Sequence, residues 1–259
     1  MLQKILRKLV VPFSLAMFAL PLIALADTAS SPAPVSMTAA QVVDRNNAAR
    51  GGSQAWKAVH SLSFSGKLDA GGKENVQLPF ELDMMRVRKT RMELQFNGQT
   101  AIQVYDGTNG WKLRPFLNRR DVEPFTPAEL KAASMQADLD GPLFDYAAKG
   151  SKVELAGTEA VEGRDTYKLK LTLKNGQVQH VWVDAQTFLE AKIEGTPRHL
   201  DGKMHPVATY FRDYRTVNGL LIPFLNETAV DGVKKTEKIV IEKVVVNPNL
   251  EESRFSKPK

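Results

Sequence analysis

Residues 167–184 read YKLKLTLKNGQVQHVWVD, and this stretch decides the fold class. Apolar and polar residues alternate on both sides of Asn175-Gly176, as in strands that bury one face. An Asn-Gly pair suits the type I′ turn of a two-residue hairpin, because both central residues of that turn need positive φ. The stretch therefore predicts two antiparallel strands joined by a tight turn.

The register of this hairpin follows from the expected two-residue loop. If the residues that flank Asn-Gly pair with each other, Leu169 lies opposite Trp182 on one side of the sheet. By the same register, Leu171 lies opposite His180. Lysine, threonine and glutamine side chains occupy the other side. We expect one apolar face, which carries His180 and Trp182, and one face toward water.

The same signals recur along the chain and predict a mainly β fold. Turn pairs separate alternating segments at Asn97-Gly98, Asn109-Gly110, Asn175-Gly176, Asn218-Gly219 and Asp231-Gly232. Strands are expected near 62–70, 74–86, 89–97, 99–106, 110–116, 151–157, 165–174, 177–184, 187–195, 206–214, 220–230 and 233–246. Because twist accumulates from strand to strand, this large antiparallel sheet should curve into an incomplete, half β-barrel with an apolar concave face.

Helix signals stand at the start of this β region and in its middle. Thr38 and Gln41 form a capping-box pattern for an N-terminal helix, which Gly51-Gly52 should end. Residues 126–129, Thr-Pro-Ala-Glu, are a second capping box with proline at the first helical position. A second short helix is expected after Asp140-Gly141-Pro142, ending at Gly150. The two central helices are expected to form a lid over the concave face.

The first residues have the layout of a secretory signal. Lys4, Arg7 and Lys8 precede an apolar run of about 15 residues, whereas a membrane-spanning helix needs roughly 20. Ala24-Leu25-Ala26 matches a signal-peptidase site, so we expect cleavage after Ala26. Residues 27–36 should be a disordered leader, and residues 37–259 a single domain.

Charge and cysteine content restrict the function classes. Removing residues 1–26 leaves 32 basic against 29 acidic residues, so the net charge falls from +6 to +3. The basic residues mostly alternate with apolar ones along strands rather than gathering on one face, so no nucleic-acid partner is expected. The chain has no cysteine, which excludes disulfides, thiol chemistry and acylation at a cysteine after the cleavage site.

Four short stretches stand at characteristic places in this order. They are Ala49-Arg50-Gly51-Gly52 with Trp56, residues 105–111 (YDGTNGW), Trp182-Val183-Asp184 before Leu189, and Phe255-Ser256-Lys257-Pro258. With these stretches, the order of the elements resembles the LolA-type outer-membrane lipoprotein-sorting proteins. The resemblance implies a periplasmic protein with a half β-barrel that is closed by helices. It also implies an apolar cavity for the acyl chains of a lipidated protein or a lipid, and donor and acceptor proteins at the inner and outer membranes.

The resemblance further implies that a basic residue near a strand-ending proline holds the lid shut. The comparable stretch here is residues 86–91, RVRKTR, which offers four basic residues and no proline. The basic residue that latches the lid therefore stays open among these four. The chain is also longer than the carriers it resembles, which leaves open whether its cargo is a lipoprotein or another acylated molecule.

Ten residues are expected to line the acyl cavity or its lid. They are Trp111, Leu130, Met135, Leu139, Leu143, Phe144, Leu169, Leu171, His180 and Trp182. Methionine adapts to ligands of variable shape, and a lid that opens needs apolar residues on its underside. The alternative for the lid residues is plain packing against the sheet. For His180 the alternative is a hydrogen-bonded core histidine, and for Trp182 it is a core position.

No enzyme motif is found in the chain. It has no nucleophile elbow, paired-histidine zinc motif, phosphate loop or dinucleotide loop, so we expect neither catalysis nor a cofactor. His199, Asp201 and His205 match no metal-ligand spacing and are interpreted as loop residues around Asp201-Gly202. Two hypotheses remain: a periplasmic carrier of acyl chains, and a sensing or assembly module of the cell envelope with a protein partner.

Overall fold

The computed structural model describes residues 37–69, 76–115 and 118–259. The chain divides into two units, Met1–Ser36 and Met37–Lys259, and only the second contains described residues. The expected export signal at 1–26 and leader at 27–36 therefore lie outside the described residues. No helix in the described ranges combines the length and the apolar character that crossing a membrane requires.

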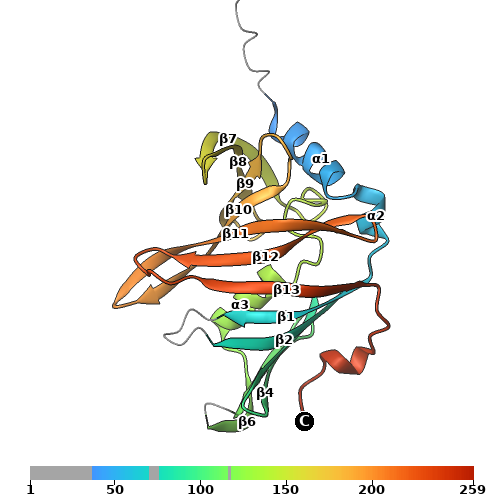
Figure 1. Ribbon diagram of the computed structural model, residues 1–259, viewed down its shortest axis with the longest axis vertical. Helices are drawn as coiled ribbons and strands as arrows, with labels where there is room; N and C mark the ends of the chain where they lie inside the picture. The colour runs from blue at the N-terminus through green and yellow to red at the C-terminus, as the bar shows by residue number, and fades with distance from the viewer. Residues whose placement is uncertain (1–36, 70–75, 116–117) are drawn as a thin grey trace, which may run out of the picture. The chain divides into compact units, whose positions relative to one another are not determined.

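The described residues form one antiparallel sheet of 13 strands (Figure 1). The alternation predicted twelve of these strands. The strands are β1 (Ser61–Asp69), β2 (Gln77–Met85), β3 (Lys89–Phe96), β4 (Gln99–Tyr105), β5 (Gly110–Arg114), β6 (Arg119–Pro124), β7 (Lys152–Val161), β8 (Arg164–Thr172), β9 (Val178–Asp184), β10 (Glu190–Leu200), β11 (Lys203–Val217), β12 (Leu220–Val230) and β13 (Glu237–Val246). Strand β6 was not expected, because its sequence, RRDVEP, lacks alternation.

The order of the strands explains why the middle of the chain covers the sheet. The order is β6-β5-β4-β3-β2-β1-β13-β12-β11-β10-β9-β8-β7, so two meanders join where β1 pairs with β13. Strands β6 and β7 are the two edges and do not pair with each other, so the sheet is not closed into a barrel. Consecutive in the chain, they lie at opposite edges, and residues 125–151 must cross the sheet between them. We call the face that they cross the inner face.

Both predicted capping boxes are confirmed. Helix α1 (Ala39–Ala49) begins with the reciprocal bonds of Thr38 and Gln41, and α3 (Pro127–Gln136) with those of Thr126 and Glu129. A one-turn helix, α2 (Ser53–Lys57), and a 3-10 helix, η2 (Glu252–Phe255), complete the helices in the described part of the chain. The expected second lid helix is wrong: residues 139–150 form turns, because Asp145 has φ of 45° and interrupts any helix there.

The register predicted for the β8–β9 hairpin is wrong by one residue. Leu173 pairs with Gln177 across a three-residue loop in which Gly176 has φ of 81°. A one-residue slip moves every side chain of one strand to the opposite face. Trp182 therefore lies opposite Lys168 and His180 opposite Lys170, on the face away from the buried leucines of β8.

Two of the five predicted type I′ turns form, and three do not. Asn97-Gly98 and Asn218-Gly219 form type I′ turns, with positive φ at both residues. In the other three pairs the first residue does not have positive φ. Gly110 belongs to β5, and a Cβ atom there would lie 2.0 Å from the Phe125 ring. This glycine is required by close packing and not by a turn.

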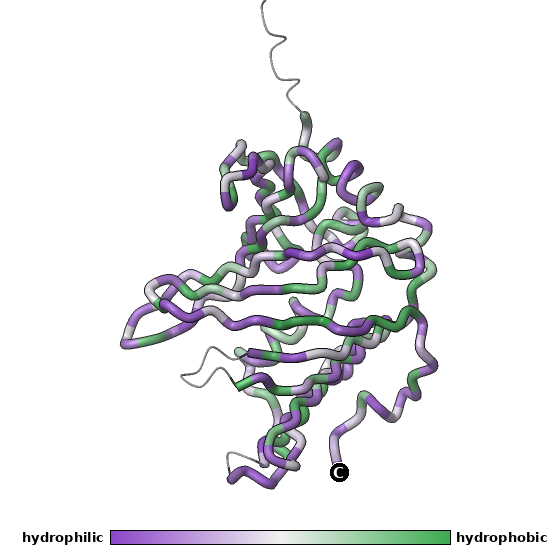
Figure 2. The backbone as a smooth tube through the Cα atoms, viewed as in Figure 1, coloured by the Kyte–Doolittle hydropathy of each residue, from purple (hydrophilic) through white to green (hydrophobic). Residues whose placement is uncertain are grey.

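The core of the domain consists of two main clusters on the inner face. One joins α2 and the middle strands, and its largest side chains include Trp56, Phe80 and Phe224. The other joins Val42 and Val43 of α1 to β8 and β9. Leu143 belongs to the second cluster and its neighbour Phe144 to the first. These two residues therefore anchor the crossing segment to both parts of the core. Figure 2 shows apolar and polar residues interleaved along the strands, as burial of one face requires.

Asp184, at the end of β9, closes the turn to β10. Its carboxylate accepts hydrogen bonds from the backbone N–H groups of Gln186 at 3.0 Å and Thr187 at 2.8 Å, and pairs with Arg164 at 3.1 Å. Burial raises the pKa of Asp184, but the bonds from Thr187 and Gln186 outweigh burial, so that its pKa is lowered. The charged form is therefore the one that the fold stabilises.

We expect Asp184→Asn to lower the free energy of unfolding by about 1–3 kcal/mol at pH 7, as loss of a charged hydrogen-bond acceptor does. Because the pKa is lowered on folding, this stability is present above the ordinary value of 3.8 and is lost as pH falls through the folded pKa. Urea unfolding at pH 7 and pH 3 measures both effects. Asp165→Asn, at an exposed position of the same hairpin, is the control. An equal difference at both pH values would contradict this account.

Candidate functional site: an apolar cavity under the crossing segment

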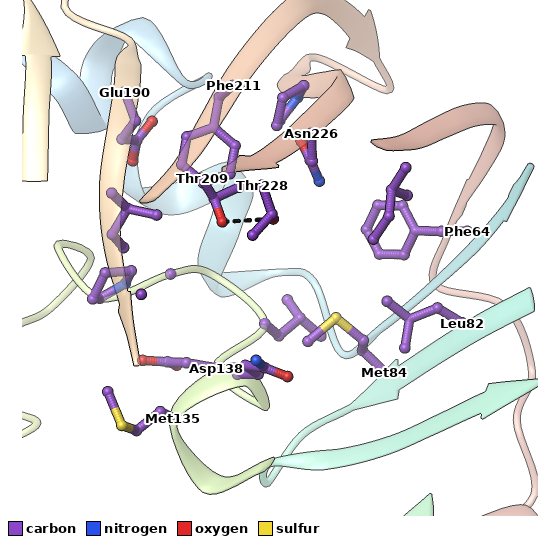
Figure 3. Close-up of a pocket in the computed structure, with 18 of the residues that line it drawn as sticks. Phe64, Leu82, Met84, Met135, Asp138, Glu190, Thr209, Phe211, Asn226 and Thr228 are labelled. Atoms are coloured by element: carbon purple, nitrogen blue, oxygen red, sulfur yellow. Dashed lines mark hydrogen bonds between the residues drawn. The ribbon is translucent and has the colours of Figure 1, made fainter. Parts of the chain in front are cut away.

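A cavity of about 490 Å³ lies between the inner face of the sheet and the segment that crosses it. Pockets for small ligands typically measure about 300–1,000 Å³. Figure 3 shows side chains from both meanders and from the crossing segment facing this space. The cavity therefore belongs to the whole sheet and not to one hairpin.

One wall of the cavity is apolar and comes from β1, β2, β3 and β13. Phe64 pairs with Leu82, and Leu82 pairs with Met92, so these three side chains form a row across three neighbouring strands. The same wall includes Phe80, Met84, Ile239 and Ile241. Alternation along each strand sends these side chains to the inner face together. A hydrocarbon chain would meet aromatic, branched and thioether groups here.

The roof is formed by α3, which is held to the sheet at its first turn. The Lys112 ammonium on β5 lies 2.5 and 2.6 Å from the two carboxylate oxygens of Glu129. Ala132, Met135 and Gln136 of α3 line the cavity, yet no residue of this helix is fully buried. An element with few buried apolar residues opens more easily than the rest of a fold.

After α3, the crossing segment is fixed by charge as well as by Leu143 and Phe144. Asp140 is 1% exposed, and its carboxylate lies 2.8 Å from Arg86 Nη2 and 2.8 Å from Lys149 Nζ. Arg86 follows β2 and also donates to the carbonyl oxygens of Val59 and Trp56. Of the four basic residues left open by the sequence, Arg86 is thus the one that contacts the segment through Asp140.

Two neighbouring carboxyl groups at this point differ in pKa. Burial raises the pKa of Asp140, but hydrogen bonds from Lys149 and Arg86 outweigh it, so the pKa is lowered. For Asp138, which lines the cavity, burial raises the pKa and exceeds the opposing effect of Lys149. Asp140 is therefore the carboxyl group whose charged form the fold favours, and Asp138 pairs with Lys149 as well, at 2.8 Å.

The short motif Ala49–Trp56 supports the crossing segment from α1. Arg50 Nη1 donates to the Asp140 carbonyl at 2.7 Å and pairs with Glu190 at 3.3 Å. The Arg50 guanidinium stacks on the Trp56 ring at 4.4 Å. A Cβ atom on Gly51, which has φ of 115°, would lie 2.4 Å from the Gly219 carbonyl oxygen. This stretch of the family resemblance thus lies directly beside the cavity.

The ten residues expected at the site occupy different parts of the domain. Met135 and Leu139 line the cavity. Leu143, Phe144, Leu169 and Leu171 are buried in the core, and Leu130 is half-buried on α3. Trp111 lies by a second, smaller hollow with Phe255 of the C-terminal turn.

His180 and Trp182 lie on the outer face because of the register slip. Lys192 and Lys168 cover the Trp182 ring at 4.0 and 5.0 Å, and His180 Nδ1 lies 2.7 Å from a Glu194 carboxylate oxygen. His199, Asp201 and His205 lie at the β10–β11 hairpin, where Asp201-Gly202 is the turn. No metal-binding group of three His, Asp or Glu residues occurs among residues that the structure describes.

Several cavity residues were not expected from the sequence. They are Phe64, Leu82, Met84, Met92, Thr209, Phe211, Asn226 and Thr228. The alternation of their strands gives their face, but only the order of all the strands shows which of them meet under α3. Polar residues at inner positions of β11 and β12 were the available signal, because such positions are usually apolar.

Neither a protein-family model nor a curated protein sequence matches the chain. Solved structures, in contrast, match the chain in fold. A LolA superfamily protein from Nitrosomonas europaea is 12% identical with a TM-score of 0.57, covering 86% of this chain and 99% of that one. A domain assigned to the outer membrane lipoprotein-sorting proteins, from Vibrio parahaemolyticus, is 15% identical with a TM-score of 0.55, covering 83% and 95%. A DUF1329 family protein from Desulfovibrio piger is 16% identical with a TM-score of 0.57, covering 85% and 98%. At these identities the similarity establishes the fold, which is that of LolA-type proteins.

Proposed function

We propose that the domain is a periplasmic carrier that takes acyl chains of lipidated proteins or lipids into the cavity and hands them on. The observation that carries the proposal is the cavity of about 490 Å³, walled by a row of Phe64, Leu82 and Met92 and roofed by α3. A largely apolar cavity takes a hydrocarbon chain out of water, which is favourable at about 25 cal/mol per Å² of buried apolar surface.

The roof gives the carrier a way to load and release its cargo. Helix α3 is tied to β5 mainly through Lys112 and Glu129, whereas the residues after it are anchored by Leu143, Phe144 and Asp140. Opening of α3 alone would expose the cavity and leave the core intact. Met135 and Leu139 would then contact the cargo, since both line the cavity.

The remaining parts of the proposal follow from the sequence. Residues 1–26 act as the export signal, and the domain acts without a covalent lipid of its own because no cysteine follows. An inner-membrane donor and an outer-membrane acceptor protein are the partners that a carrier of lipoproteins requires. Catalysis has no part in this function.

Binding of a fluorescent acylated peptide probe, whose acyl chain is attached through an uncharged amide, to the purified protein tests the proposal. We expect saturable binding at one site, with displacement by unlabelled acyl compounds, because a cavity of about 490 Å³ has the size of a site for one small ligand. Fluorescence titration measures the stoichiometry. Absence of binding at high micromolar probe would rule out the carrier.

Crosslinking in cells separates this function from an envelope sensing or assembly module with a protein partner. A carrier contacts each cargo in turn, so many acylated proteins or lipids should be trapped from positions on α3. A sensing module would instead yield one fixed partner. Mass spectrometry of the crosslinked products identifies which pattern occurs.

A further inference from the structure

The wall of the cavity opposite the apolar row is polar. Thr209 of β11 and Thr228 of β12 pair directly across the sheet, with their hydroxyl oxygens 3.0 Å apart. Asn226 is the next inward-facing residue of β12, opposite Phe211 and Ile239. Figure 3 shows Thr209, Thr228 and Asn226 on one side of the space, with Phe64, Leu82 and Met84 across from them. A ligand in this cavity touches both kinds of surface.

The amide of Asn226 has an unused acceptor. Its Oδ1 atom is buried and has no hydrogen-bond partner, and among the described residues that line the cavity no other side chain has such an atom. Buried polar atoms without partners are rare in proteins, and each one requires an explanation. Asparagine is also disfavoured in strands, so local propensity does not explain its presence. A hydrogen-bond donor on a bound ligand explains it.

The threonine pair supplies the complementary group. When one hydroxyl donates to the other across 3.0 Å, the second hydroxyl keeps a hydrogen that it can donate elsewhere. Asn226 and the pair therefore present an acceptor and a donor on neighbouring positions of the same wall. A ligand group with a donor beside an acceptor, such as a secondary amide, satisfies both.

The charges around the cavity argue against an anionic head group. The ionisable acids whose carboxyl groups face it are Asp138 and Glu190, since the Glu194 carboxylate pairs with His180 on the outer face, and the only lining cation among the described residues is Arg50. Arg50 is already paired with Glu190 at 3.3 Å. A ligand carboxylate would add a third acid to a partly desolvated space, which repulsion and desolvation both disfavour. An uncharged head group is therefore preferred.

We infer that Asn226, Thr209 and Thr228 form a polar subsite for the linkage next to an acyl chain. The ligand class is an uncharged amphiphile with a hydrogen-bond donor beside an acceptor, as in an N-acyl amide. Its chain lies along Phe64, Leu82 and Met92. This inference rests on the proposed function, because it assumes that the cavity receives an acyl chain, and it adds which head group the cavity selects.

Two ligands of equal shape test the subsite: N-methyl decanamide has a donor N–H where methyl decanoate has an ester oxygen. Affinities come from displacement of a fluorescent acyl probe. We expect the amide-to-ester affinity ratio to fall about tenfold in Asn226→Leu, the size of effect that loss of one buried hydrogen bond produces. Binding of the ester should stay at or above the wild-type level, since leucine adds apolar surface.

Gln179→Leu is the matched control. Gln179 also lines the cavity, but its Nε2 already donates to the Glu194 carbonyl at 2.6 Å, so its loss should leave the ratio unchanged. A ratio that is equal in the wild type and in Asn226→Leu overturns the subsite while both ligands still bind. Failure of both ligands to bind the wild type overturns the carrier function and the subsite with it.

Discussion

Asp140→Asn is expected to lower the free energy of unfolding by about 3 kcal/mol, the low end of the range for breaking a buried ion pair. The Asp140 carboxylate is 1% exposed and compensates two cations, Arg86 and Lys149, which are themselves 34% and 22% exposed. Neutralising it leaves Arg86 without a carboxylate partner and leaves Lys149 with Asp138 alone, at 2.8 Å. Their partial exposure to water keeps the effect from reaching the upper end of that range.

The same substitution should loosen the segment that crosses the cavity. Amide hydrogen exchange in residues 139–150 should become faster, since this segment loses its contact with β2 through Arg86. Because the pKa of Asp140 is lowered on folding, its contribution is present above the ordinary value of 3.8 and is lost as pH falls through the folded pKa. The difference between wild type and Asp140→Asn should therefore shrink near pH 3.

Asp145→Asn is the matched control for this experiment. Asp145 lies in the same segment and pairs with Lys57 at 3.9 Å, but both side chains are about half exposed. Exposed ion pairs contribute little, so this variant should change stability by less than about 1 kcal/mol. Equal effects of the two substitutions in urea unfolding would show that Asp140 does not secure the segment.

Much of the fold was predictable because period-two alternation and helix capping are local signals. Twelve segments with alternation became strands, and both capping boxes formed as the residue types require. The face of the sheet on which a side chain lies was harder to predict, because the length of the adjoining turn sets the register. Asn175-Gly176 could form a two-residue or a three-residue loop, and the actual three-residue loop moved Trp182 to the outer face.

The arrangement of the site depends on contacts that no local pattern contains. Phe64, Leu82 and Thr228 meet one cavity only because β1 pairs with β13, a contact between the two ends of the domain. Arg86 could not be distinguished from its basic neighbours, since its partner Asp140 lies 54 positions along the chain. Leu143 and Phe144 were expected on the lid, with plain packing as the alternative, and their burial places them in the core.

The strongest effect on binding is expected from Ala132→Trp. Ala132 points from α3 into the cavity, so an indole there would occupy space that the acyl chain needs. We expect the affinity for a fluorescent acyl probe to fall at least tenfold, a loss of roughly 1.4 kcal/mol or more. The fold should tolerate the change, because no residue of α3 is fully buried and tryptophan costs a helix only about 0.5 kcal/mol relative to alanine.

Lys131→Trp places the same ring one residue earlier, at an exposed position of α3. It should bind the probe as the wild type does, which separates occupation of the cavity from any general effect of tryptophan on the helix. Unfolding in urea confirms that both variants fold. Wild-type affinity in a folded Ala132→Trp variant would mean that the probe binds elsewhere, because a chain under α3 cannot share that space with an indole.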